Sequence, residues 1–155
     1  MSFSTLDDFL SRAVDRLDPI SGTQQLNETG DLDFVDDDRK ETIRPAAVLI
    51  PVIPRPTGAT ALLTQRPDTM ASHPGQVAFP GGKIDAVDAD EVAAALREAE
   101  EEVGVVPETV ELVARAAPYV TGTAFRITPV LGVLPADVQA RPEPTEVAYV
   151  FEAPL

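Results

Sequence analysis

The sequence predicts an α/β fold, an α/β/α sandwich formed by one domain. Short apolar runs typical of strands stand on both sides of one strongly patterned helix, and a second amphipathic helix lies near the N-terminus. Elements that each bury one face pack in layers around a shared core. The length of 155 residues fits one such domain, and the chain shows no internal repeat.

Composition and charge narrow the functional class. The hydrophobic content of 44% is ordinary for a globular protein, and the net charge of −14 argues against nucleic acid or an anionic membrane as a partner. The absence of cysteine excludes a disulfide framework and a thiol nucleophile. The N-terminus has no apolar signal-peptide core, and no run approaches the ~18 residues of a membrane span. We therefore expect a cytoplasmic enzyme.

Two segments of contrasting character precede the first strand. Residues 4–17 carry apolar side chains at helical steps, and Ser4 with Asp7 resembles a capping box. We predict an amphipathic surface helix there, without a part in the chemistry. Residues from about 20 to 43 are polar and acidic, including the aspartates 36–38. We interpret this acidic segment as an irregular, solvated loop that contributes no catalytic group.

Short apolar runs between turn residues are the strand candidates. The first two candidates, residues 46–53 and 60–64, are expected to pair across the turn at residues 56–58, which contains proline and glycine. A loop at 67–76 then precedes a shorter run at 77–79. The predicted strands are 46–53, 60–64, 110–116, 127–134 and 146–151.

Residues 81–105 combine a glycine turn, an acidic loop and one helix with two unlike faces. Steps of three and four place apolar side chains on one stripe and carboxylates on another. Asp88 and Glu91 resemble a capping box at the start of this helix. Gly104 suits the left-handed residue that closes a helix, and Pro107 prevents the helix from resuming. The apolar set is Val92, Leu96, Ala99 and Val103, and the acidic set is Glu98, Glu101 and Glu102.

The crowded carboxylates have two interpretations, a solvated acidic face and a metal site. Glu98 and Glu102 form a like-charge pair four residues apart, which destabilises a bare helix by roughly a few tenths of a kcal/mol. Hard cations require carboxylate oxygens that converge, often with a backbone carbonyl and substrate phosphate oxygens. A turn at Gly81 and Gly82 brings bare backbone close to the helix, because glycine has no side chain in the way. This glycine pair favours the metal site.

The spacing around this helix resembles the Nudix box. Gly82, five residues, Asp88, eight residues and the run Arg-Glu-Ala-x-Glu-Glu-x-Gly-Val at 97–105 stand in its order, so the box spans residues 82–105. The usual pattern has Glu in place of Asp88 and seven residues rather than eight before the Arg-Glu pair. Both departures are similar to those of one branch of the family, the coenzyme A diphosphatases.

Upstream residues resemble the second motif of that branch. Leu-Leu-Thr-Gln-Arg at 62–66, His-Pro-Gly at 73–75 and Phe-Pro-Gly-Gly at 79–82 follow its spacing. Pro67 stands where the branch usually has Ser or Ala, and Ala71 stands where it usually has Arg. The resemblance therefore covers the superfamily, and the exact substrate stays open.

The resemblance implies a Nudix-type α/β/α sandwich that hydrolyses a nucleoside diphosphate linked to another group, with water and a divalent metal, Mg²⁺ or Mn²⁺. Phosphoryl transfer depends mostly on positioning and charge stabilisation, which metal ions bridging the phosphate oxygens supply. The implied metal ligands are Glu98, Glu101, Glu102 and the Gly81 carbonyl. Arg97 is expected to orient a box glutamate through an ion pair.

Further residues have a functional and a structural interpretation each. Glu98 is the first candidate for the catalytic base, Glu101 lies beside it, and Glu143 or Glu146 outside the box are alternatives. For substrate binding, Arg66 is a candidate phosphate ligand or a member of a structural ion pair. His73 is a candidate substrate ligand or a structural loop residue, and Lys83 is a candidate phosphate ligand or a simple surface residue. These seven residues complete the predicted site.

Three functions remain open at this stage. The leading one is hydrolysis of coenzyme A or its derivatives to 4′-phosphopantetheine and adenosine 3′,5′-diphosphate. The second keeps the chemistry with ADP-ribose, a dinucleotide or an oxidised nucleotide as substrate. The third is a catalytically silent Nudix domain that binds a nucleotide as a sensor, which the intact Arg-Glu-x-x-Glu-Glu core disfavours. In each case the partner is a small nucleotide, and a homodimer is possible.

Overall fold

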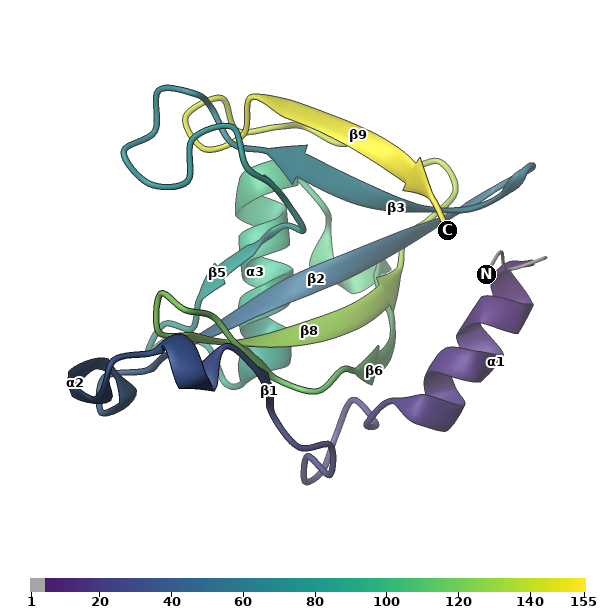
Figure 1. The fold of residues 1–155 in the computed structure, drawn as a ribbon. Helices are drawn as coiled ribbons and strands as arrows, with labels where there is room; N and C mark the ends of the chain where they lie inside the picture. Colours follow the sequence, from purple (N-terminus) through teal and green to yellow (C-terminus); the bar gives the residue numbers. More distant parts are fainter. Residues whose placement is uncertain (1–4) are drawn as a thin grey trace.

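A computed structural model describes residues 5–155 of the chain, and Figure 1 shows its elements. The helical elements in chain order are α1 (Leu6–Arg16), η1 (Leu32–Phe34), α2 (Asp37–Lys40), α3 (Glu91–Val103) and η2 (Pro107–Thr109). The strands are β1 (Thr29–Gly30), β2 (Arg44–Arg55), β3 (Gly58–Gln65), β4 (Val77–Ala78), β5 (Gly81–Lys83), β6 (Glu111–Arg115), β7 (Tyr119–Val120), β8 (Phe125–Val133) and β9 (Tyr149–Pro154).

All of these strands belong to one mixed sheet. Its main path runs β1-β7-β8-β2-β3-β4, while β5 pairs with β2, β6 with β8 and β9 with β3. The two longest neighbours, β2 and β8, are parallel, and β2 pairs antiparallel with both β3 and β5. The predicted α/β class with a mixed sheet is confirmed. β2 is the central strand, because it connects the two halves of the sheet.

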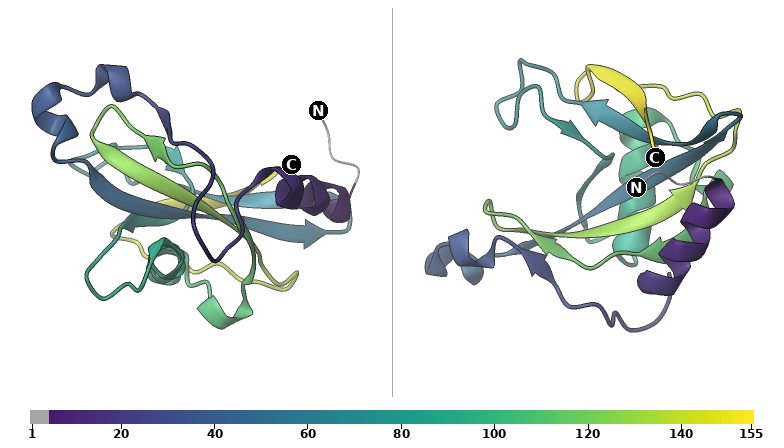
Figure 2. Two further views of the ribbon diagram at one scale, coloured as in Figure 1. Left: turned by 90° about the horizontal axis from the view of Figure 1, so that it is seen from below. Right: turned by 45° about the vertical axis from the view of Figure 1, so that its right-hand side comes forward.

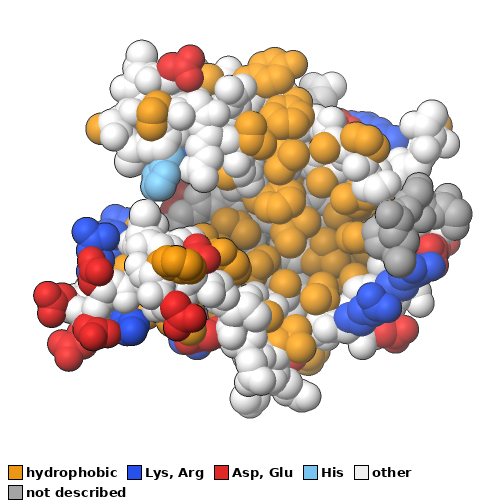
Figure 3. Space-filling view, viewed as in Figure 1, with side chains coloured by type: hydrophobic (Ala, Val, Ile, Leu, Met, Phe, Trp, Pro, Cys, Tyr) orange, Lys and Arg blue, Asp and Glu red, His pale blue; other side chains and the backbone are white. Residues whose placement is uncertain are grey.

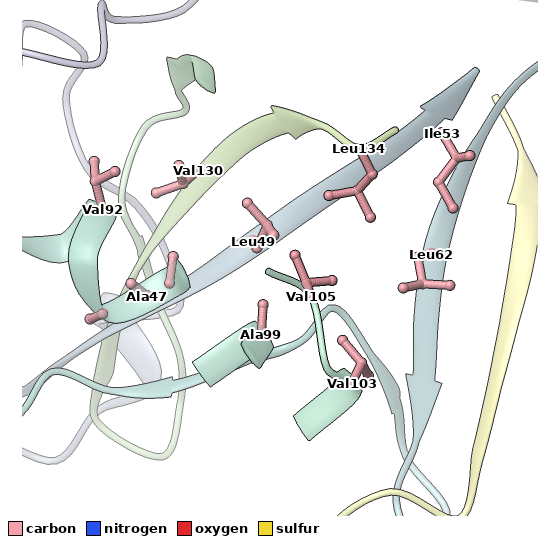
Figure 4. Close-up of a cluster of buried hydrophobic side chains, with 12 residues drawn as sticks. Ala47, Leu49, Ile53, Leu62, Val92, Ala99, Val103, Val105, Val130 and Leu134 are labelled. Carbon is pink, nitrogen blue, oxygen red and sulfur yellow. The ribbon is translucent and has the colours of Figure 1, made fainter. Parts of the chain in front are cut away.

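The main core lies between α3 and one face of the sheet (Figure 4). Ala47 and Leu49 alternate along β2 and point toward α3, as the period of two along a strand requires. The predicted apolar stripe of the helix is buried except for Leu96, which is only partly buried. The buried side chains of α3 are Val92, Ala94, Ala95, Ala99 and Val103.

The opposite face of the sheet is only partly covered. α1 packs at one end of this face, where Phe9 and Leu10 contact a cluster that includes Val52 and Leu131. Figure 2 shows α1 and α3 on opposite sides of the sheet. Beyond α1, hydrophobic side chains spread over the sheet as one continuous surface (Figure 3). Within residues 5–155, every helix falls short of the length and hydrophobicity that a membrane span requires.

Both predicted helix starts need correction. α1 is capped by Thr5, whose side chain accepts from the Asp8 N–H, while Ser4 lies outside the described residues. α3 is capped by Asp90, whose carboxylate accepts from the Ala93 N–H at 2.8 Å, not by Asp88. Asp90 takes the extended backbone conformation that an N-cap requires, directly before the first helical residue. The helix end is as predicted, with Gly104 at φ 71°.

Four regions differ from the sequence-based expectation. The acidic segment at 20–43 is not irregular throughout, since it holds β1, η1 and α2. The last strand begins at Tyr149, because residues 143–147 form a turn in which two N–H groups donate to the Glu143 carbonyl. The short strands β5 and β7 were not anticipated, because two or three residues are too few to show a period.

Candidate functional site

The glycine pair of β5 lies directly against the acidic face of α3. Gly82 is opposite Ala47 of β2, and a Cβ atom placed on Gly82 would lie 2.7 Å from the carboxylate carbon of Glu98. The N–H of Gly81 donates to Glu102 Oε2 at 3.3 Å. Any side chain at Gly82 would therefore displace the Glu98 carboxylate. The glycines bring bare backbone and two glutamates together at one point, as the sequence predicts.

Arg97 connects the acidic loop with the glutamates of α3. Its Nε and Nη2 donate to the two oxygens of Asp88 at 2.8 and 2.9 Å. Its Nη1 donates to Glu98 Oε1 at 3.0 Å and to Glu101 Oε2 at 3.2 Å, and Nη2 also donates to the Lys83 carbonyl. These bonds lower the pKa of Asp88 and raise that of Arg97 above its ordinary value. Arg97 thus holds Glu98 in one orientation. Asp88 accepts hydrogen bonds from this arginine and does not cap the helix.

Glu98 and Glu102 are half-buried carboxyl groups whose charged forms the protein alone does not fully compensate. Burial raises the pKa of Glu102 to about 7, opposed by the Gly81 N–H and assisted by the charges of Glu98 and Glu146. Burial also raises the pKa of Glu98, opposed by its bonds to Arg97. Two half-buried carboxylates that repel each other form a site where the charged state requires a cation.

This donor set fits a divalent metal ion. Glu98 and Glu102 supply hard oxygen ligands beside the backbone of Gly81, and Glu146 is close enough to raise the pKa of both. Glu101 is more peripheral, with 55% of its side chain exposed and its carboxylate bound to Arg97. Within residues 5–155, no three acidic or histidine side chains already stand at metal-binding distance.

The two candidate bases outside the box differ in position. The charge of Glu146 acts on both buried glutamates. The carboxylate of Glu143 accepts from the N–H and hydroxyl of Thr145 at 3.4 and 3.1 Å. Of the two alternatives named from the sequence, Glu146 therefore lies nearer the site.

The raised pKa of Glu102 predicts a pH-dependent stability of the metal-free protein. The folded state binds a proton near pH 7 that the unfolded state releases near its ordinary value of 4.5. This contribution to the free energy of unfolding is present below pH 4.5 and is lost as the pH rises through about 7. Between pH 4.5 and 8 the free energy of unfolding should therefore fall by roughly 2–3 kcal/mol more in the wild-type protein than in Glu102→Gln. Urea unfolding in the presence of a chelator measures this difference. An unchanged pH profile in the variant would contradict the prediction.

A cleft of about 600 Å³ opens on the other side of the glycine pair. Its floor consists of alternate residues of β2 and β8, Ala46 and Val48 with Phe125 and Ile127, on the sheet face away from α3. Figure 3 shows it as a hollow with the single histidine, His73, at its edge. Of the described residues that line it, none is acidic. A hollow without carboxylates, in a chain of net charge −14, suits an anionic ligand.

The cleft collects all three substrate-binding candidates. Arg66, His73 and Lys83 line it together with Gly81 and Gly82. Arg66 also donates through Nε to the Ser72 carbonyl at 3.2 Å, which ties it to the loop at 67–76. The structure thus brings together groups that are up to 17 positions apart in sequence.

The sequence did not indicate Arg44, which lines the same cleft. Its guanidinium lies 4.1 Å from the ring centroid of Phe125, its register partner on the parallel strand β8. The two residues are 81 positions apart, so no local pattern joins them. The pair could be found only by predicting that β2 and β8 are parallel neighbours in this register.

Comparison with known proteins identifies relatives of the chain. The NUDIX domain family matches residues 43–155. The Nudix hydrolase NudL of Escherichia coli (strain SMS-3-5 / SECEC), itself described as uncharacterized, is 46% identical over 151 residues. That match covers 97% of this chain and 70% of the relative.

Solved structures support the fold. The Ap4A hydrolase of C. elegans in a binary complex superposes with a TM-score of 0.61 and 20% identity, covering 70% of this chain and 79% of that one. The Nudix hydrolase RenU of M. smegmatis superposes with a TM-score of 0.58 and 23% identity, covering 88% and 76%. At this level of identity the likeness extends to the architecture alone.

Proposed function

Because the chain belongs to the Nudix family of hydrolases, we propose that it cleaves the diphosphate linkage of coenzyme A or its derivatives. The products are 4′-phosphopantetheine, or an acylated form, and adenosine 3′,5′-diphosphate. The resemblance to the coenzyme A branch at 62–66, 73–75 and 79–82 supports this substrate. ADP-ribose, a dinucleotide or an oxidised nucleotide is the alternative substrate for the same chemistry.

The observation that carries the proposal is the position of the cleft. Arg66, His73 and Lys83 line a hollow without carboxylates, and its wall at Gly81 and Gly82 is the backbone that contacts the buried glutamates. A diphosphate bound here has cationic side chains on one side and the metal-binding carboxylates on the other. The arrangement resolves the conflict between an acidic enzyme and an anionic substrate.

The parts of the acidic residues and of Arg97 follow from this arrangement. We assign Glu98 and Glu102, with Gly81 and the more peripheral Glu101, to holding Mg²⁺ or Mn²⁺. A divalent ion held there would neutralise charge on the phosphate oxygens and would make a water molecule more acidic. Arg97 fixes the orientation of Glu98 through its bond of 3.0 Å. Glu98 or Glu146 accepts the proton of the attacking water.

The cationic residues bind the substrate. We assign the phosphate oxygens to Arg66 and Lys83, and a hydrogen bond to substrate to His73. The branch motif has a further cation at position 71, where this chain has alanine. The absence of that cation is consistent with a different set of contacts to coenzyme A here. We place the enzyme in the cytoplasm.

A hydrolysis screen tests the proposal. Coenzyme A, dephospho-coenzyme A, ADP-ribose and diadenosine polyphosphates are incubated with the protein in Mg²⁺ or Mn²⁺, and products are separated by chromatography. We expect coenzyme A to be the substrate with the highest kcat/KM and excess chelator to abolish turnover. Faster cleavage of ADP-ribose would show that ADP-ribose, and not coenzyme A, is the preferred substrate. Nucleotide binding without any turnover would favour the sensor.

A further inference from the structure

A second hollow lies beside the substrate cleft and shares a wall with it. It has a volume of about 560 Å³ and is lined by Arg39, Thr42, Arg44, Thr123 and Ala124. Arg44 and Thr123 also line the first cleft, so the two hollows meet at these residues. In Figure 1 this region lies at the end of the sheet where α2 precedes β2. Arg39 and Arg44 have no part in the metal and substrate contacts proposed for the first cleft.

The shared wall is flat and cationic. The Arg44 guanidinium stands 4.1 Å from the centroid of the Phe125 ring. A purine base stacks well on aromatic rings and on the guanidinium plane of arginine. The wall between the hollows therefore suits the base of a nucleotide.

The backbone around this wall is fixed. Ala124 adopts a left-handed conformation with φ 62°, which is uncommon for a residue other than glycine. Thr121 stabilises it, since its carbonyl accepts from the Ala124 N–H at 3.0 Å and its hydroxyl accepts from the Phe125 N–H at 3.1 Å. The Arg44 N–H donates to the Ala124 carbonyl at 3.0 Å. These hydrogen bonds hold the backbone that carries the Phe125 ring and the Arg44 side chain.

Over residues 5–155, the second hollow is lined by two arginines and by no acidic side chain. Neither Arg39 nor Arg44 has an acidic partner in the part of the chain that the structure describes. The adjacent aspartates 36–38 do not line the hollow, and Asp37 is paired with Lys40 at 2.9 Å. Two guanidinium groups with two threonine hydroxyls at their side match the oxygens of a phosphate group.

The distance from the glycine pair to Arg44 suits one nucleoside. Gly82, which contacts Glu98, is opposite Ala47 of β2. Arg44 is three residues from Ala47 along the same strand, which corresponds to about 10 Å. A diphosphate at the glycine pair would therefore place its own nucleoside at the Arg44 wall, with the far side of the ribose toward Arg39.

We propose that the second hollow is a binding site for a phosphate group on the ribose of the substrate, with the base stacked on the Arg44–Phe125 wall. For coenzyme A this group is the 3′-phosphate, an identification that rests on the proposed function. Arg39 and Arg44 are then specificity-determining residues that distinguish a ribose-phosphorylated nucleotide from its unphosphorylated counterpart. The site then includes Arg39 of the acidic segment at 20–43, a segment for which the sequence analysis predicts no catalytic group.

Calorimetric binding in excess chelator tests this site separately from catalysis. The probes are adenosine 3′,5′-diphosphate and adenosine 5′-monophosphate, which differ only in the 3′-phosphate. We expect the diphosphate to bind at least tenfold more tightly, and Arg39→Gln to remove that preference while leaving the affinity for the monophosphate unchanged. Lys40→Gln is the matched control, because it removes the same charge from the neighbouring, ion-paired position and should have no effect.

The shared wall makes a separate contribution. Phe125→Leu should weaken binding of both nucleotides by the same factor, since the base is common to them. Equal affinities of the wild-type protein for the two probes would overturn the proposal. An equal loss in Lys40→Gln and Arg39→Gln would also overturn it, because the effect would then be general electrostatics.

Steady-state kinetics separates this inference from the proposed function. In Arg39→Gln we expect KM to rise about tenfold for coenzyme A and to stay unchanged for dephospho-coenzyme A, with the same kcat for both. If coenzyme A is not hydrolysed but the diphosphate still binds preferentially, the proposed function fails and the phosphate site stands. If coenzyme A is hydrolysed with no discrimination between the probes, the proposed function stands and the phosphate site fails.

Discussion

Replacing Glu102 by glutamine is expected to reduce kcat for the preferred diphosphate substrate about 10³-fold, the largest effect of any single change considered. Glu102 is one of two half-buried carboxylates at the glycine pair, and its replacement removes one carboxylate ligand from the proposed metal site. A bound metal stabilises the transition state by several kcal/mol, and each 1.36 kcal/mol corresponds to a factor of ten in rate. Glutamine keeps an oxygen that can accept from the Gly81 N–H, so the local fold should persist.

The measurement needs a control for acidic residues in general. Glu100→Gln changes an exposed residue of the same helix and should retain wild-type turnover. Metal affinity, followed by titration of Mn²⁺, should fall in Glu102→Gln and not in Glu100→Gln. Wild-type turnover in Glu102→Gln, with full activity in chelator, would exclude the metal site from catalysis.

The second large effect is expected for Gly82→Ala, which adds one methyl group beside Glu98. The new Cβ would lie 2.7 Å from both the carboxylate carbon and Oε1 of Glu98, closer than such atoms approach in proteins. Because Glu98 is flexible at its end, the side chain should move and the fold should tolerate the change. Displacement of a catalytic group by about 1 Å costs on the order of 100-fold in rate, so we expect kcat to fall by about that factor.

Gly122→Ala is the matched control for this glycine substitution. A Cβ at Gly122 meets no atom within 4 Å, so turnover and stability should both stay close to wild type. Unfolding in urea distinguishes a displaced carboxylate from a damaged fold, because only the latter lowers the midpoint. A Gly82→Ala enzyme with normal turnover would show that the position of Glu98 is not critical.

Features encoded by neighbouring residues were predictable from the sequence. The apolar stripe of α3 and its end at Gly104 follow from steps of three and four and from a single left-handed residue. The close approach of the turn at Gly81 and Gly82 to the helix face was also anticipated, since the glycine turn and the helix are close in sequence. In each case the interaction lies within about 20 residues, where spacing along the chain limits the geometry.

Features that depend on competing local partners or on the pairing of distant strands could not be predicted from the sequence. Asp88 and Asp90 are both suitable helix caps by composition, and only the structure shows that Arg97 engages Asp88 while Asp90 caps the helix. The Arg44–Phe125 wall depends on the register of β2 and β8, which spacing does not specify. Pairing between distant strands is determined by the packing of the whole sheet.

The open face of the sheet has a consequence for the behaviour of the protein in solution. Half-buried side chains such as Ile50, Val113 and Leu155 form an apolar surface beside α1, on a molecule whose net charge is −14. At low ionic strength, mutual repulsion opposes contact between two such surfaces. The screening length shortens from about 10 Å at 0.1 M salt to about 3 Å at 1 M, while hydrophobic association persists. Colloidal stability should therefore decline as salt is added, and dilute buffers are the condition in which single molecules stay dispersed.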